Sequence, residues 1–118
     1  MTRVPAQVIA YARQIRSALE KRSDIDTNLA GACALASMML AAAIGDADVF
    51  RVGFFMRREN FCGHRSRYPN THAWCRIGPA IVDVTATQFG RFPAIYIVGV
   101  DATDRYVECA NGMHVCKP

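Results

Sequence analysis

The stretch THAWCRIGPAIVDVTATQF, residues 71–89, carries the pattern that decides the fold. Two strand-like runs, residues 71–77 and 80–85, flank the dipeptide Gly78-Pro79. Both runs are rich in β-branched and aromatic residues, and glycine followed by proline is typical of a turn. The stretch therefore predicts a β-hairpin.

The length of that turn decides which side chains meet across the hairpin. If the turn has two residues, Ile77 lies opposite Ala80, and His72 and Asp83 become diagonal neighbours on one face, which Trp74 shares. A turn with an odd number of residues would put His72 and Asp83 on opposite faces. A carboxylate in such an apolar strand needs a partner, so we expect the two-residue turn.

A cysteine stands at the start of the second predicted helix. Residues 33–44, CALASMMLAAAI, are apolar nearly all round and precede Gly45, so they predict a buried helix that begins at Cys33. The free N–H groups and positive partial charge of a helix start lower the pKa of a cysteine there. The same N–H groups can stabilise an oxyanion. Cys33, His72 and Asp83 then supply a nucleophile, a base and a group that orients the base.

The other segments predict helices first and strands afterwards. The apolar spacing of residues 4–21 predicts an amphipathic helix, and the polar, arginine-rich residues 57–70 predict a loop. Further strands are expected at residues 50–56, 94–100, 105–110 and 113–116, the last two joined at Asn111-Gly112. We therefore expect one domain over residues 1–118, of the α+β class, with N-terminal helices packed on an antiparallel sheet.

The order Cys, His, Asp, with His-Ala-Trp on one strand and Val-Asp-Val-Thr on the next, resembles the transglutaminase-like branch of the papain-like cysteine protease superfamily. The resemblance covers about residues 28–89. Within that superfamily the chain is similar to compact bacterial members such as lasso-peptide leader peptidases and effector-type thiol enzymes.

The resemblance implies a role for each matching residue. Cys33 would be the catalytic nucleophile, His72 the base and Asp83 the residue that orients His72. An amide upstream of the cysteine often completes the oxyanion hole in the superfamily. The candidates for oxyanion or substrate binding are Asn28, Gln88 and Trp74.

The resemblance also implies a cysteine-dependent amide hydrolase or acyltransferase: a peptidase, a deamidase or a transglutaminase. An enzyme of this kind would need no cofactor and no metal. The substrate would be a peptide or protein. Because the chain is too short for further subdomains around a deep cleft, we expect a protein partner to complete that cleft.

Charge and hydropathy restrict the partners. The formal net charge is +4, and the arginines concentrate at positions 57, 58, 65 and 67. No nucleic-acid-binding motif accompanies them, so we do not expect nucleic acid as a partner. The longest apolar run, residues 29–44, falls short of the ~20 residues that span a bilayer, and no signal peptide precedes it. We expect a cytoplasmic protein without a membrane partner, with export by a route that needs no classical signal as the alternative.

Two non-catalytic functions remain open on the sequence. The first is a zinc-binding module, whose candidate ligands are Cys62, His64, Cys109, His114 and Cys116, although paired Cys-x₂₋₄-Cys knuckles are missing. The second is a basic module that uses the arginines to bind nucleic acid or protein. The five cysteines are an odd number, so we expect at least one free thiol and no disulfide framework.

Overall fold

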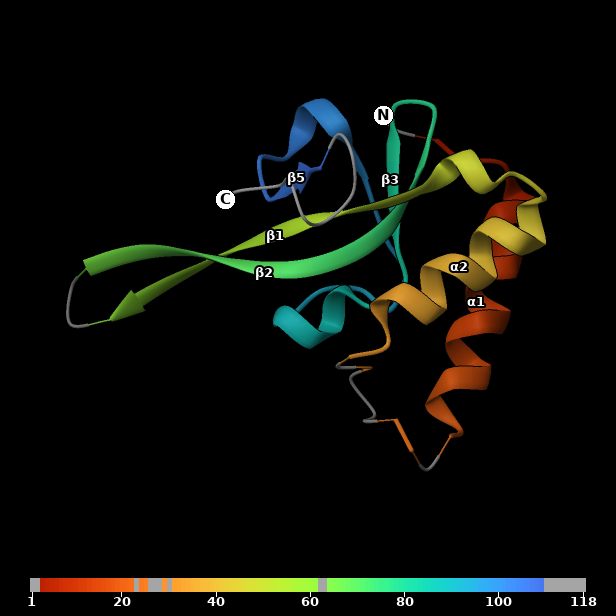
Figure 1. The fold of residues 1–118 in the computed structure, drawn as a ribbon, viewed down its shortest axis with the longest axis horizontal. Coiled ribbons are helices and arrows are strands. Elements are labelled where there is room, and N and C mark those ends of the chain that lie inside the picture. The colour runs from red at the N-terminus through yellow and green to blue at the C-terminus, as the bar shows by residue number, and fades with distance from the viewer. Residues whose placement is uncertain (1–2, 23, 26–28, 30, 62–63, 110–118) are drawn as a thin grey trace.

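The structure is a computed structural model that describes residues 3–22, 24–25, 29, 31–61 and 64–109, with the side chains of 57–61 and 64–69 left out of the description. It is an α+β fold in which two helices pack on a curled antiparallel sheet (Figure 1). This confirms the predicted fold class. No helix in these ranges is long and apolar enough to cross a bilayer.

The two helices begin and end close to where the sequence predicts. Helix α1 spans Ala6–Glu20, and helix α2 spans Cys33–Ile44 and ends at Gly45, which takes the left-handed conformation at φ 82°. The expectation that α2 is buried all round is wrong. Leu35 is 39% exposed and Met38 57% exposed, because the sheet and α1 cover the other side of the helix.

The sheet has the strand order β4-β3-β2-β1-β5, and its neighbours pair antiparallel. The strands are β1 Phe50–Phe61, β2 His64–Ile77, β3 Ala80–Asp83, β4 Tyr96–Gly99 and β5 Tyr106–Glu108. Short 3₁₀ helices at Ala47–Val49 (η1), Ala86–Phe89 (η2) and Val100–Ala102 (η3) connect them. The strand expected at 113–116 and the turn at 111–112 lie outside the described residues.

The predicted hairpin register is confirmed. Ile77 pairs with Ala80 and Cys75 with Val82, so the turn contains Gly78 and Pro79 alone. Gly78 has φ 58°, a conformation that glycine adopts without strain. The even turn puts His72 and Asp83 on the same face of the sheet.

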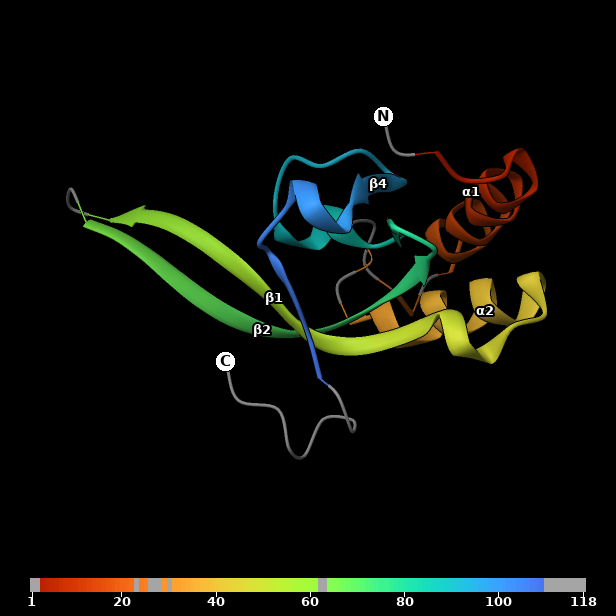
Figure 2. The same cartoon turned by 90° about the horizontal axis from the view of Figure 1, so that it is seen from above.

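The loop predicted at residues 57–70 is wrong. β1 and β2 pair without interruption from Phe50↔Cys75 to Phe61↔His64. They form a long two-stranded arm that projects from the body in both views (Figures 1 and 2). The polar composition suggested a loop, but backbone pairing continues from the buried part of the two strands, which outweighs low strand propensity.

The sheet separates two clusters of side chains. On one face, aliphatic residues of α1 and α2 pack against Cys75, Val82 and Val84 and form the main core. On the other face lies an aromatic cluster that surrounds His72: Phe55, Trp74, Phe89, Phe92 and Tyr106. The alternation of side chains along β2 produces this division, since His72 and Trp74 point away from the face that Cys75 occupies.

The cysteines within the described residues fall into two states. Cys33 and Cys75 are free thiols, as the odd count requires of at least one cysteine. Cys109 is disulfide-bonded, and this bond by itself does not form the disulfide framework that the odd number of cysteines argued against.

Candidate active site

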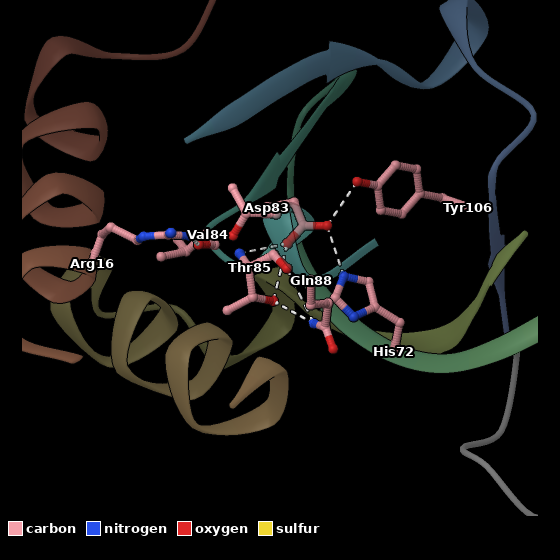
Figure 3. A network of polar contacts seen from close by, with 8 residues as sticks. Arg16, His72, Asp83, Val84, Thr85, Gln88 and Tyr106 are labelled. Atoms are coloured by element: carbon pink, nitrogen blue, oxygen red, sulfur yellow. Dashed lines mark hydrogen bonds and ion pairs between the residues drawn. The ribbon is translucent and has the colours of Figure 1, made fainter. Parts of the chain in front are cut away.

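A buried histidine–aspartate pair lies at the centre of the aromatic face. Nε2 of His72 lies 2.7 Å from Oδ2 of Asp83, and both side chains are 0% exposed. His72 comes from β2 and Asp83 from the end of β3, so the hairpin register positions both (Figure 3). A charged pair at this separation, shielded from water, interacts far more strongly than a surface pair.

Asp83 accepts further hydrogen bonds that the sequence did not suggest. The hydroxyl of Tyr106 donates to Oδ2 at 2.7 Å, the same oxygen that faces His72 (Figure 3). The backbone N–H of Thr85 donates to Oδ1 at 2.9 Å, and its hydroxyl lies 3.4 Å from the same atom. Both carboxylate oxygens therefore have donors, which offsets the cost of burying the charge.

The protonation of His72 follows from this arrangement. Burial favours the neutral ring, but the negative charge of Asp83 and the hydrogen bond to it raise the pKa of His72 to about 9. Interaction with Cys33 contributes in the same direction. Near neutral pH the ring is a cation.

The positive charge of His72 affects the pKa of the Cys33 thiol. Burial opposes ionisation, but interaction with His72 and its positive charge lowers the pKa of Cys33 below its ordinary value. The backbone N–H groups of Ala73 and Ala34 act in the same direction. Cys33 is partly exposed, so a substrate can reach its sulfur.

The two ring nitrogens of His72 have different partners. Nε2 is committed to Asp83. Nδ1 is buried and makes no hydrogen bond of ordinary geometry to any described residue. His72 and the Cys33 thiol nevertheless lie close enough for each to shift the pKa of the other. Nucleophile–base contacts are often long without substrate and tighten when substrate binds.

Cys75, also a free thiol, has a different environment. Cys75 is 0% exposed and donates to the backbone oxygen of Ser37 at 3.3 Å. Burial, followed by the charge of Asp83, raises the pKa of Cys75 to about 12. Cys75 is therefore a protonated core residue near neutral pH, in contrast to Cys33.

Trp74 screens the pair from water. It is 2% exposed, and its ring centroid lies 6.0 Å from that of His72 and 5.1 Å from that of Tyr106. Exclusion of water strengthens the electrostatic interactions inside the site. Because the Trp74 ring is almost fully buried, it is placed to shield the His72–Asp83 pair and not to contact a substrate.

Two side-chain amides are predicted for oxyanion binding, those of Gln88 and Asn28. Nε2 of Gln88 donates to the backbone oxygen of Thr85 at 3.1 Å and lies 3.2 Å from its hydroxyl, so this amide is engaged in the turn after Asp83. Asn28 lies outside the described residues. The N–H group of Ala34 at the start of α2 lies close enough to Cys33 to lower its pKa.

A buried arginine ties the segment after Asp83 to helix α1. Nη1 of Arg16 donates to the backbone oxygen of Val84 and to the hydroxyl of Thr87, both at 2.9 Å. Val84 lies directly between Asp83 and Thr85 (Figure 3). Arg16 thus fixes the backbone that presents the carboxylate.

A glycine permits the close packing around His72. Gly53 is the cross-strand partner of His72 on β1 and of Glu108 on β5. A Cβ at Gly53 would lie 2.0 Å from the backbone oxygen of Val107 and 2.9 Å from the Trp74 ring. No L side chain fits there without displacement of β5, the strand that carries Tyr106.

No pattern in the sequence points directly to Tyr106, Arg16 or Gly53. Asp83 offers indirect evidence for a further donor, because a buried carboxylate can accept several hydrogen bonds and a single histidine supplies one. A search for a tyrosine hydroxyl on the later strands would have reduced the candidates to Tyr96 and Tyr106.

The residues described here contain no group of three or more histidine, cysteine, aspartate or glutamate side chains that could hold a metal ion. Of the candidate zinc ligands, Cys109 is disulfide-bonded and so is not available as a thiolate. Cys62, His114 and Cys116 lie outside the described residues, as does the side chain of His64.

A scan against protein-family models finds no match to this chain, and neither do searches of the curated proteins and of the solved structures.

Proposed function

We propose that this chain is a thiol hydrolase or acyltransferase that acts on peptide or side-chain amide bonds through Cys33, His72 and Asp83. The observation that carries the proposal is the buried His72–Asp83 pair, 2.7 Å apart, which keeps the imidazole charged beside a thiol of lowered pKa. A structural histidine would not require a buried carboxylate, and a structural cysteine would resemble Cys75.

In the proposed reaction the Cys33 thiolate attacks the carbonyl carbon of the amide and forms a C–S bond. The oxygen takes up the negative charge, which the N–H groups at the start of α2 would stabilise. His72 gives its proton to the amide nitrogen, the C–N bond breaks and an amine leaves. Asp83 stays ionised throughout and holds the ring by Nε2.

The second half-reaction returns the enzyme to its starting state. His72, now neutral, accepts a proton from the incoming nucleophile, which attacks the thioester carbonyl. Water as nucleophile releases a carboxylic acid, so the net result is proteolysis or deamidation. An amine as nucleophile forms a new amide, which is cross-linking. In both cases the C–S bond breaks and the Cys33 thiolate and the imidazolium re-form.

The proposal includes membership of the papain-like superfamily, in its transglutaminase-like branch. It is supported by a nucleophile at the first residue of α2 and by a histidine strand followed by an aspartate strand across a two-residue turn. The α+β architecture is consistent with it. The site, not the fold, is the basis of the functional argument.

A direct test compares Cys33 and Cys75, the free thiols in the described part of the chain, as a matched pair. Wild-type protein, Cys33→Ala and Cys75→Ala are incubated with a peptide digest of denatured casein and a primary amine. Mass spectrometry then distinguishes hydrolysis, deamidation and amine incorporation. In parallel, each protein is treated with limiting iodoacetamide near pH 7 and the modified cysteine is mapped.

We expect Cys33 to be the most rapidly alkylated thiol, and any turnover to persist in Cys75→Ala and vanish in Cys33→Ala. Turnover that survives in folded Cys33→Ala would contradict the proposal. So would a Cys33 that reacts no faster than a cysteine in an unstructured peptide, whether or not a substrate is found.

A further inference from the structure

A cavity outside the candidate active site lies between helix α1 and the segment that leads into β4, two elements that Figure 2 labels. Its volume is about 410 Å³. Binding sites for small molecules typically measure roughly 300–1,000 Å³, so a small organic molecule fits this cavity. Its lining combines charged and apolar side chains, which include Arg13, Arg16, Glu20, Ile9, Ile95 and Ile97.

Arg16 is the buried cation of the cavity. Its side chain is 8% exposed, and its Nη1 donates to two neutral oxygens, those of the Val84 backbone and the Thr87 hydroxyl. Oε2 of Glu20 lies 3.2 Å from Nε, but this contact lacks the geometry of a hydrogen bond, and Nε is buried without an acceptor among the described residues. The Glu20 side chain is 45% exposed, so water weakens this ion pair. A buried guanidinium with an unused donor favours a further anion.

Arg13 brings a second guanidinium group to the same cavity. It precedes Arg16 by three residues on α1, a spacing that puts two side chains on the same side of a helix. Arg13 is exposed and has no hydrogen bond or ion pair to a described residue. Within the cavity lining, Glu20 therefore supplies one negative charge for two positive charges. Arginine pairs are well suited to a carboxylate, because its two oxygens accept parallel N–H donors.

The opposite side of the cavity is apolar. Ile95 and Ile97 are two residues apart at the start of β4, so they share a face, and both are half-buried against the main core. Ile9 continues this surface on α1. Removal of hydrocarbon from water is favourable, so such a wall favours an anion with an aliphatic body over a small hydrated anion.

We propose that this cavity is a binding site for an aliphatic carboxylate. Arg13 and Arg16 hold the carboxylate, which replaces Glu20 as the counter-ion of Arg16, and the hydrocarbon packs on the isoleucine wall. Two sources carry this chemistry: a free aliphatic acid, and the C-terminal carboxylate of a peptide that ends in an aliphatic residue. The inference does not depend on the proposed function, because none of Cys33, His72 and Asp83 lines the cavity.

The test titrates the isotope-labelled full chain with hexanoate and follows the Nε–Hε signals of its arginines by NMR. Hexanamide, which lacks the charge, and sulfate, which lacks the hydrocarbon, are the comparison probes at equal ionic strength. The peptide acetyl-Ala-Ala-Leu, with a free or an amidated C-terminus, distinguishes the two sources. The variants are Arg13→Gln and Glu20→Gln, and the matched control is Arg3→Gln, which removes the same charge from an exposed position outside the cavity.

We expect hexanoate to shift the Arg13 and Arg16 signals. Arg13→Gln should weaken binding roughly tenfold, Arg3→Gln should change it by less than about twofold, and Glu20→Gln should tighten it by roughly threefold because a competing carboxylate is gone. Tighter binding of the free-acid peptide than of hexanoate identifies a chain end as the ligand, and the reverse identifies a free acid; both support the site.

Four results would overturn the inference. They are the absence of binding to the wild type, equal binding of hexanamide or sulfate, an equal loss in Arg13→Gln and Arg3→Gln, and weaker binding in Glu20→Gln. Because Arg13 and Glu20 are exposed or partly exposed on α1, each single variant keeps the core of the fold intact, and the dispersion of the backbone amide signals verifies this in the same spectra.

Discussion

The substitution Asp83→Asn removes the charge that holds His72 protonated and keeps the shape of the side chain. In the wild type Tyr106 donates to Oδ2 at 2.7 Å and the Thr85 N–H donates to Oδ1 at 2.9 Å. An asparagine has a single oxygen, so it keeps one of these two bonds; with that oxygen toward Thr85, its NH₂ group takes the place of Oδ2 and can donate to the Tyr106 hydroxyl and to a neutral His72 ring. What is lost is the negative charge 2.7 Å from Nε2 of His72. The variant therefore separates the electrostatic role of Asp83 from its role in packing.

The size of the effect follows from the pKa of His72. It stands at about 9, against an ordinary 6.5. At about 1.4 kcal/mol for each factor of ten, this is a stabilisation of the imidazolium by roughly 3 kcal/mol. Because burial favours the neutral ring and Asp83 is the main opposing influence, the pKa of His72 in the variant should fall below 6.5. The site is buried, so solvent screening does not reduce the effect much.

The consequence reaches Cys33. With a neutral His72 at pH 7, the thiolate loses the cation that lowers its pKa, and the thiolate fraction falls towards the few per cent of an ordinary cysteine. Alkylation of Cys33 at pH 7 should then slow by roughly 10–100-fold. The deficit should shrink as the pH rises past about 9, where the wild-type His72 loses its own proton.

The assay is the pH dependence of iodoacetamide labelling at Cys33, followed by peptide mapping in folded protein. Asp101→Asn, which removes an exposed carboxylate, is the control for net charge. Overlapping pH profiles for wild type and folded Asp83→Asn would refute the reasoning and leave at most a Cys33–His72 dyad. A slow rate in the variant at every pH would point instead to a misplaced thiol.

Three further outcomes are expected. Tyr106→Phe keeps the ring but removes a donor from Asp83, so the free energy of unfolding should fall by about 1.5–3 kcal/mol in a urea titration. Gly53→Ala should destabilise the fold by several kcal/mol or detach β5, because its Cβ would lie 2.0 Å from the Val107 backbone oxygen; an unchanged melting temperature would contradict this. Cys75→Ala should lose about 1 kcal/mol of stability while the labelling rate of Cys33 stays within about twofold, as a core thiol outside the chemistry requires.

Local patterns predicted the parts of the site that lie close together in sequence. The turn at Gly78-Pro79 fixed the parity of the hairpin, and parity alone brought His72 and Asp83 to one face. The bounds of α2 followed from the apolar run and from Gly45, the glycine that ends the helix. These are short-range consequences of period, turn chemistry and capping.

What the sequence did not predict depends on long-range pairing. Tyr106 reaches Asp83 because β5 pairs with β1, a strand about fifty residues earlier in the chain, and a short polar strand gives no sign of its partner. The arm looked like a loop, since arginine, asparagine and proline are poor strand formers by themselves. The exposed side of α2 shows the same limit, because an apolar helix does not reveal how much of its surface neighbours will cover.

The most direct test of the central claim is the ultraviolet absorbance of the thiolate at pH values below the ordinary pKa of a cysteine, measured in wild type, Cys33→Ala and His72→Ala. The pKa values of His72 and Cys33 imply an ion pair below the ordinary pKa of a thiol. We predict a thiolate signal in the wild type that disappears in both variants. A wild type that shows no thiolate until the pH approaches the ordinary value for cysteine would contradict the account.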